Sequence, residues 1–266
     1  NRKKILLKLF YGYIMLDKIK EFAKEVDISK ANVINEYIKS LQDENRILSY
    51  WDNGFKDNPK KYIDDINVNR YVSYNDRKKI RNNRFCPEEI FDYTCGSFNR
   101  VMRWKGIPLY KNTYDFALYP TILTEIQPKT IIELGTGDGA SCIWYKDILQ
   151  SNNLESKIIT FDIHKPIKYF KGIEYEQFNL NNINEVTFNN CSHPWLVIED
   201  CHSNLGGILN YFDKQMISGD YLIIEDNSKQ KQKIIDEFNN INNYTVDTRY
   251  SDFYGYNNCS FSDSIL

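Results

Sequence analysis

Short apolar runs alternate with helical segments through the second half of this 266-residue chain, and this alternation constrains the fold most strongly. A short apolar run suits a buried strand, whereas apolar residues three or four positions apart suit a helix packed on a sheet. Repeated units of this kind predict a doubly wound α/β fold, in which helices cover both faces of a mostly parallel sheet. We expect strands at 130–134, 158–162, 173–178, 195–199, 221–225 and 244–249, and helices at 140–150, 183–189, 205–217 and 229–239.

Residues 1–95 read differently and predict a helical N-terminal extension ahead of a domain spanning 96–266. Apolar residues at helical spacing predict amphipathic helices over 4–26 and 29–48. Their apolar faces need a surface to cover, so we expect either a lid or the subunit interface of a homo-oligomer. The basic run 77–84 is typical of a solvated face; the alternative is a phosphate-binding strip or a cover over a site.

The composition is that of a globular protein, with 42% hydrophobic and 26% charged residues. The apolar stretch 9–16 is the longest, and a membrane span needs roughly 18 residues, so we expect none. A net charge of −2 gives no general attraction to nucleic acid, which makes a nucleic-acid substrate unfavoured. The six cysteines form no CxxC pair, so we expect a reduced, cytoplasmic protein. Because Asn1 is not Met, we also expect the chain to be part of a longer one.

A glycine-rich turn follows the expected strand 130–134. Glycines at the start of a helix allow a tight turn and let backbone N–H groups approach a ligand. Read as GxGxxA, the turn fits a dinucleotide fingerprint; read as ExGxGxG, it fits the first motif of S-adenosylmethionine-dependent methyltransferases. Glu133 favours the second interpretation, because an acidic group there can hold the cofactor's charged amino-acid end. The expected cofactor-binding residues of the turn are Glu133, Gly135, Thr136, Gly137, Gly139 and Ser141.

Asp162 ends the next expected strand and is the remaining cofactor candidate. An acidic residue about 20 positions beyond such a glycine turn can accept hydrogen bonds from two ribose hydroxyls. This role suits either cofactor and does not choose between them. The alternative is that Asp162 caps a following helix.

Carboxylates follow two further expected strands, as Glu199-Asp200 and Glu225-Asp226. The carboxyl ends of parallel strands meet at one edge of the sheet, where four acids would repel one another without a cation. An oxygen-rich cluster suits a hard divalent ion such as Mg²⁺, and we expect Asp200, Glu225 and Asp226 as its ligands. Whether Glu199 takes the place of Asp200 stays open, and the alternative to a metal site is helix capping and pairing with lysine.

His202 lies two residues after Asp200 and is the candidate general base. The competing interpretation is that the metal alone acidifies the acceptor hydroxyl and the imidazole fills space. His193 precedes the same strand, so we expect it at the opposite edge of the sheet, away from the chemistry.

Several segments together resemble the cephalosporin hydroxylase / rhamnosyl O-methyltransferase family. They are 104–109, Asp115, 130–137, 194–200 and 219–226. The resemblance implies a Rossmann-like class I methyltransferase with a metal site like that of catechol O-methyltransferase. It further implies methyl transfer from S-adenosylmethionine to a hydroxyl of a sugar, glycoside or natural product, with Mg²⁺ or another divalent cation. The family's acidic-x-x-His motif is matched by Glu199 and His202, whereas counting from Asp200 the spacing is one residue shorter.

Two other classes compete with this interpretation. The GxGxxA reading of the turn predicts an NAD-dependent oxidoreductase, which a comparison of S-adenosylmethionine with NADH binding separates. The shortened spacing before His202 keeps open a binding module that has the fold without turnover.

Overall fold

The structure is a computed structural model that describes residues 70–80, 102–253 and 265–266. The chain divides into two compact units, Asn1–Ile66 and Asn67–Leu266, and all described residues belong to the second. The helices expected at 4–26 and 29–48, with their interface or lid role, lie outside the described residues. The domain boundary expected at residue 95 lies outside them as well and stays a prediction.

Five parallel strands form the central sheet in the order β6-β5-β4-β7-β8. They are β4 (Thr130–Leu134), β5 (Lys157–Asp162), β6 (Glu174–Gln177), β7 (Trp195–Glu199) and β8 (Tyr221–Ile224). In register, Thr130 of β4 lies beside Lys157 on one side and Trp195 on the other. The chain moves outward from β4 to β6 and then returns to place β7 on the other side of β4. This switch opens a crevice at the carboxyl ends of β4 and β7, where such sheets bind ligands.

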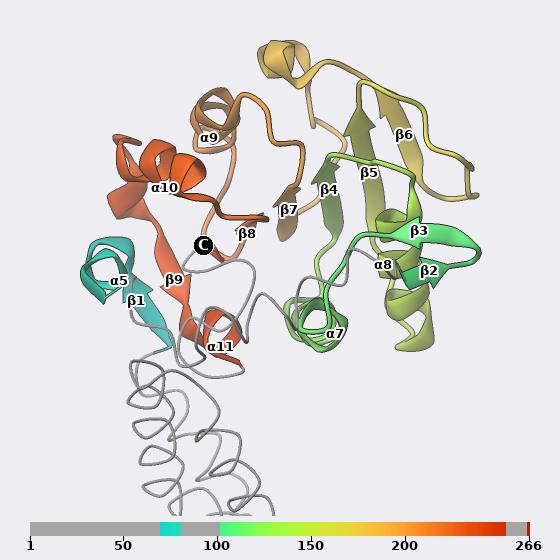
Figure 1. Cartoon of the computed structure of the whole chain (residues 1–266), viewed down its shortest axis with the longest axis horizontal. Helices are drawn as coiled ribbons and strands as arrows, with labels where there is room; N and C mark the ends of the chain where they lie inside the picture. The colour runs from blue at the N-terminus through green and yellow to red at the C-terminus, as the bar shows by residue number, and fades with distance from the viewer. Residues whose placement is uncertain (1–69, 81–101, 254–264) are drawn as a thin grey trace, which may run out of the picture. The chain divides into compact units, whose positions relative to one another are not determined.

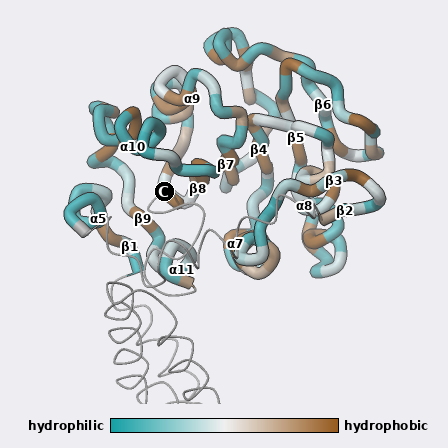
Figure 2. Tube along the Cα trace, viewed as in Figure 1, coloured by the Kyte–Doolittle hydropathy of each residue, from teal (hydrophilic) through white to brown (hydrophobic). Residues whose placement is uncertain are grey.

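Helices cover both faces of the sheet, which confirms the doubly wound α/β prediction (Figure 1). Side chains alternate along each strand, so Ile132 and Val197 face one layer while Ile131 and Leu196 face the other. The first layer is built by α9 (Leu205–Phe212), α10 (Lys229–Asp236) and the 3₁₀ helix η2 (Leu180–Glu185), and the second by α7 (Asp115–Ile126) and α8 (Ala140–Ser151). Most residues of α10 are hydrophilic (Figure 2).

Three expected elements differ clearly from the structure, and one is the helix expected at 205–217, which ends at Phe212 as α9. The helix expected at 183–189 is wrong: a short 3₁₀ helix, η2, ends at Glu185, and Asn182 inside it has non-helical backbone angles. Asn179 caps its start by accepting from the Asn181 N–H, a turn-forming bond that competes with a longer helix. The strand expected at 244–249 shrinks to β9 (Thr245–Asp247), which does not join the parallel sheet.

Instead, β9 pairs antiparallel with β1 (Tyr71–Ser73), and the C-terminal residues lie between β9 and the central sheet. Ile265 forms an antiparallel bridge with Ile223 of β8 and accepts a hydrogen bond from the Asp247 N–H. The remaining described elements are α5 (Tyr74–Ile80), the hairpin β2 (Met102–Trp104) and β3 (Ile107–Leu109), η3 (Ile241–Asn243) and α11 (Thr248–Ser251). No helix among the described residues has the length and apolar character to cross a bilayer.

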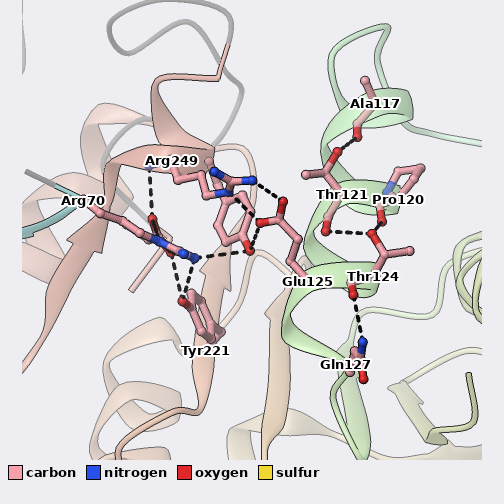
Figure 3. A network of polar contacts seen from close by, with 11 residues as sticks. Arg70, Ala117, Pro120, Thr121, Thr124, Glu125, Gln127, Tyr221 and Arg249 are labelled. Carbon is pink, nitrogen blue, oxygen red and sulfur yellow. Dashed lines mark hydrogen bonds and ion pairs between the residues drawn. The ribbon is translucent and has the colours of Figure 1, made fainter. Parts of the chain in front are cut away.

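A polar network ties these outer elements to the starting end of β8 (Figure 3). Arg70 donates to both oxygens of buried Asp247, at 3.0 and 2.8 Å, and Tyr221 donates to the same carboxylate at 2.9 Å. Arg249 reaches across to Glu125 of α7, with its Nε at 2.6 Å. These charge-assisted hydrogen bonds fix the positions of α7 and β9 beside the sheet.

The described part of the basic run 77–84 divides: Lys78 and Lys79 are exposed, as expected of a solvated face, whereas Arg77 lies against the fold. Arg77 of α5 is 2% exposed and its guanidinium forms a two-pronged pair with Asp252 at 2.8 and 2.9 Å. Lys78 lies 3.2 Å from Asp236. Arg77 therefore has a packing role, and neither a solvated face nor a phosphate strip describes it.

Candidate active site

A cavity of about 420 Å³ lies at the carboxyl ends of the strands. It is lined by the glycine turn, by Asp162 at the end of β5, by residues 200–203 after β7 and by Asp226 after β8. A further segment, 108–111, closes it from the loop that leads from β3 to α7. The cavity thus occupies the crevice that the strand order predicts.

Backbone conformation and the surrounding space explain why two positions of the turn are glycine. Gly135 has φ +116°, and a Cβ there would lie 2.6 Å from the carbonyl oxygen of Asp200, so only glycine lets the turn pack against the end of β7. Gly137 has φ +51°, and a Cβ there would meet no atom within 4 Å. A side chain at residue 137 would therefore project into open space at the cavity wall.

Asp162 binds the glycine turn directly. One carboxylate oxygen accepts from the Gly137 N–H at 2.9 Å and the other accepts from the His164 N–H at 2.8 Å. The carboxylate also lines the cavity. Asp162 thus positions the turn at the cavity, and each carboxylate oxygen keeps a further lone pair with which it could accept another hydrogen bond.

Glu133 lies beneath the turn and is 1% exposed. Its carboxylate accepts from Thr160 Oγ1 at 2.6 Å, and that hydroxyl lies 2.6 Å from Thr136 Oγ1. Burial raises the pKa of Glu133 to about 7, although hydrogen bonds from Ser141 and Thr160 oppose the shift. Of these groups Thr136 and Ser141 line the cavity, so a contact of Glu133 with a ligand would pass through them or through water.

Three groups gather at the ends of β7 and β8: Asp200, His202 and Asp226. One ligand atom from each lies within 4.8 Å of the others. The His202 Nε2 is 3.6 Å from Asp200 Oδ1 and 3.5 Å from Asp226 Oδ2. His202 and Asp226 also have φ of +53° and +46°, a left-handed conformation that costs free energy outside glycine. The loops after β7 and β8 therefore adopt an unfavourable backbone conformation at the two residues whose polar side chains converge.

Glu225, the third predicted metal ligand, has other partners. Its carboxylate pairs with the ammonium of Lys111 and accepts from the Tyr119 hydroxyl. Lys111 also lies 2.9 Å from Asp200 Oδ2 and is almost fully buried. Burial disfavours its charge, but Asp200 and Glu225 outweigh that effect and raise the pKa of Lys111 well above its ordinary value. The site therefore contains a buried, paired ammonium that sequence analysis does not predict.

The neighbouring pair Glu199 and Asp200 divides between two environments. Glu199 is completely buried, and Lys231 of α10 donates to it at 2.7 Å and to the Glu225 carbonyl at 2.7 Å. Asp200 instead lines the cavity. Of the two acids left open above, Asp200 is the one placed to meet a ligand.

His193 lies at the starting edge of the sheet, as its place before β7 predicts. Its Nδ1 is 2.8 Å from Asp220 Oδ2, next to the start of β8. Lys111 and Tyr119 are the site residues that sequence analysis misses. A lone lysine in a polar loop and a tyrosine on an apolar helix face are typical of solvent exposure and of core packing respectively, so neither carries a local signal.

A parallel sheet whose order reverses at β4, with a glycine turn at the switch and an aspartate ending the next strand, is the arrangement by which doubly wound sheets bind adenosine-containing cofactors. The family described as Rhamnosyl O-methyltransferase/CmcI matches residues 97–243, which is more than half of the chain. The chain therefore belongs to this family of S-adenosylmethionine-dependent O-methyltransferases.

Individual relatives are distant. The rhamnosyl O-methyltransferase of Mycobacterium leprae is 21% identical over 164 residues, covering 57% of this chain and 72% of that protein. The protein of the same name from Mycobacterium tuberculosis is 34% identical over 59 residues, or 22% of this chain and 24% of that one.

Solved structures of CmcI have the same fold. The CmcI structure with Mg and SAM aligns with a TM-score of 0.52 at 22% identity, covering 62% of this chain and 75% of that one. The structure with SAH aligns at 0.51 and 23% identity, covering 62% and 80%. Family membership favours the methyltransferase interpretation of the glycine turn over the dinucleotide one.

Proposed function

We propose that this chain moves a methyl group from S-adenosylmethionine to a hydroxyl of a saccharide, glycoside or related natural product, and that it needs a divalent cation. The observation that carries the proposal is one shared cavity, lined both by the glycine turn with Asp162 and by Asp200, His202 and Asp226. The rhamnosyl O-methyltransferases among the relatives support a sugar hydroxyl as the acceptor.

S-adenosylmethionine, when bound, supplies a methyl group on a positively charged sulfur. The glycine turn leads into the N-terminus of α8, where backbone N–H groups favour the negative end of a ligand. Asp162 would hold the ribose hydroxyls, and Glu133 would act through Ser141 or a water. The residues assigned to cofactor binding are Glu133, Gly135, Thr136, Gly137, Gly139, Ser141 and Asp162.

The donor set fits a hard divalent ion. Asp200 and Asp226 offer carboxylate oxygens, and His202 offers a nitrogen, within 4.8 Å of one another at the cavity. Asp200 and Asp226 would hold Mg²⁺ or Mn²⁺, and Glu225 would join them if its carboxylate left Lys111. A bound ion lowers the pKa of a hydroxyl that approaches it.

We assign His202 the role of the general base that accepts the proton of the acceptor hydroxyl. The reaction converts the sulfonium and a hydroxyl into S-adenosylhomocysteine, a methyl ether and one proton, which leaves the hydroxyl as its oxygen bonds to the methyl carbon. The His202 Nε2 lies 3.6 Å from Asp200 Oδ1 and 3.5 Å from Asp226 Oδ2, beside the proposed ion site that the acceptor hydroxyl would approach. His202 would accept the proton at this place, while binding of both reactants in one cavity would hold them in line.

Calorimetry with S-adenosylmethionine and with NADH tests the cofactor. Gly137→Val should abolish S-adenosylmethionine binding because its side chain fills the open space at the cavity wall. Gly219→Val is the matched control, since Gly219 has φ +98° and equally open surroundings but precedes the start of β8, away from the cavity. NADH binding, or unchanged affinity in Gly137→Val, would contradict the assignment.

Turnover on a rhamnosyl glycoside tests the metal. Excess EDTA should stop it and Mg²⁺ should restore it, whereas Asp226→Asn should raise the Mg²⁺ concentration required. Full activity in EDTA would mean that the acidic cluster serves without an ion. The expected homo-oligomer stays a prediction, which light scattering of the full chain measures.

A further inference from the structure

Lys111 is the cation on which two carboxylates of the acidic cluster converge. Its ammonium lies 2.9 Å from Asp200 Oδ2 and pairs with Glu225 as well. We propose, on the basis of the metal-dependent reaction proposed above, that Lys111 is an internal counter-cation that competes with the divalent ion for Asp200 and Glu225. The ion then gains full coordination only when the ammonium leaves at least one of these carboxylates.

Charge balance explains why the lysine is needed. Asp200, Glu225 and Asp226 lie close enough to repel one another if all three are ionised without a cation. Lys111 and Glu225 are 2% and 6% exposed at their side chains, so water screens their charges poorly. One ammonium satisfies two carboxylates here, and a dication at the same oxygens would be repelled by it.

Asp200 is the group that both cations would share. Its Oδ2 faces Lys111, whereas its Oδ1 faces His202 within the metal candidate cluster. Glu225 is engaged on its second oxygen by the Tyr119 hydroxyl. In this arrangement the lysine, and not the order of the acids in the sequence, decides which carboxylates remain for an ion.

The backbone beside Lys111 is anchored, so the exchange needs only its side chain to move. The Asn112 N–H donates to Asp115 at 2.7 Å, and the Tyr114 N–H donates to the Asn112 side chain at 2.8 Å. A lysine side chain has four rotatable bonds and can swing its ammonium away while the loop stays in place. The device therefore requires no rearrangement of the fold.

Mn²⁺ binding to the full chain tests the proposal by calorimetry without cofactor. Lys111→Met removes the charge in a similar volume, and it should bind Mn²⁺ about tenfold or more tightly than the unaltered chain. Lys111→Arg keeps the charge and should stay within about twofold of the unaltered chain. Lys105→Met is the control for lost charge alone, because Lys105 pairs with Asp147 on the surface at 2.8 Å.

Thermal unfolding gives a second readout that does not depend on turnover. In EDTA, Lys111→Met should melt about 5–10 °C below the unaltered chain, because it leaves buried carboxylates without a cation. Mn²⁺ should close most of this gap. A variant that stays unfolded with Mn²⁺ would show that no ion replaces the ammonium, and it would overturn the proposal.

The outcomes separate this proposal from the proposed function. Equal Mn²⁺ affinity in all variants, weaker binding by Lys111→Met, or an equal gain from Lys105→Met overturns the competition but leaves a metal site. Failure of every variant to bind Mn²⁺ removes the metal from the proposed function and the competition with it. Binding by Lys111→Met alone supports the competition in its strongest form.

Discussion

Two buried lysines neutralise the carboxylates at the ends of β7 and β8, and they do so in different surroundings. Lys231 extends from α10 beneath the strands and pairs with Glu199, which is sealed from solvent. Lys111 extends from the loop before α7 and pairs with Asp200 and Glu225 at the cavity. A lysine therefore pairs with buried carboxylates twice at these strand ends. We call the pair of Lys231 with Glu199 the closed side, and the contacts of Lys111 at the cavity the open side.

The comparison shows how adjacent acids come to have different roles. Alternation along β7 and its following loop sends Glu199 inward and Asp200 towards the cavity. Lys231 also donates to the Glu225 carbonyl at 2.7 Å, so the closed pair supports the backbone from which the open pair acts. We therefore expect losses of stability from changes on the closed side, and losses of ion binding or rate from changes on the open side.

The largest expected effect is on the open side, in His202→Asn. Asn tolerates the left-handed backbone at this position, so the variant removes the imidazole without adding strain. The rate should fall by about 10²–10⁴-fold with nearly unchanged S-adenosylmethionine affinity, because proton acceptance is lost and cofactor contacts remain. Single-turnover kinetics and calorimetry measure the two quantities. His193→Asn makes the same change at the opposite edge of the sheet and should leave the rate unaltered; a loss below tenfold in His202→Asn would favour acidification by the ion alone.

The closed side is tested by Lys231→Met. Removing the ammonium leaves Glu199 buried without its partner, which should lower the free energy of unfolding by about 3–5 kcal/mol in urea denaturation. Lys233→Met, on the exposed side of the same helix, should change it by less than about 0.5 kcal/mol. The double change Glu199→Gln with Lys231→Met should recover part of the loss. Mn²⁺ should not rescue Lys231→Met, and rescue equal to that of Lys111→Met would erase the distinction between the two sides.

The sequence alone predicted those parts of the site that depend on residues close together in the chain. Short apolar runs between segments of helical spacing predicted β4, β5, β7 and β8. The meeting of parallel strand ends predicted an edge where Asp162, Asp200 and Asp226 would lie. Sequence analysis expected a strand at 244–249 but could not predict that β9 pairs with β1 outside the central sheet, because β1 lies far away in the chain. Lys111 was not predicted as a site residue for the same reason, because its partners Asp200 and Glu225 follow two strands that are distant in the sequence. Its pairing with Glu225 exists only in the folded chain.

Glu133 extends the comparison to a buried carboxylate held by hydroxyl groups instead of lysine. Burial raises its pKa from 4.5 to about 7, so the folded chain resists ionising it more than the unfolded chain does. Native stability should therefore fall as the pH rises from about 4.5 to 7 and remain lowered above that. Glu133→Gln should remove this loss and be relatively more stable at pH 8 than at pH 5, by an amount on the order of 2–3 kcal/mol.

Chemical denaturation at the two pH values measures this difference. Glu185→Gln, at an exposed position of η2, is the matched control and should show no such dependence. An equal effect of Glu133→Gln at both pH values would mean that the carboxyl ionises as readily in the folded chain as in the unfolded one.

The smallest expected effect concerns how the loop that carries Lys111 is coupled to the glycine turn. Tyr110 is 66% exposed, and its hydroxyl donates to Asp138 at 3.1 Å, joining the two segments at the cavity. Tyr110→Phe removes one exposed hydrogen bond, so stability should change by less than about 1 kcal/mol while S-adenosylmethionine affinity falls about 2–5-fold. A double-mutant cycle with Asp138→Ala, which removes the acceptor, separates coupling from simple loss: if the pair acts as a unit, the double variant binds no more weakly than either single one. Additive losses would mean that each residue acts on the cofactor independently and that the loop of Lys111 is not coupled to the glycine turn.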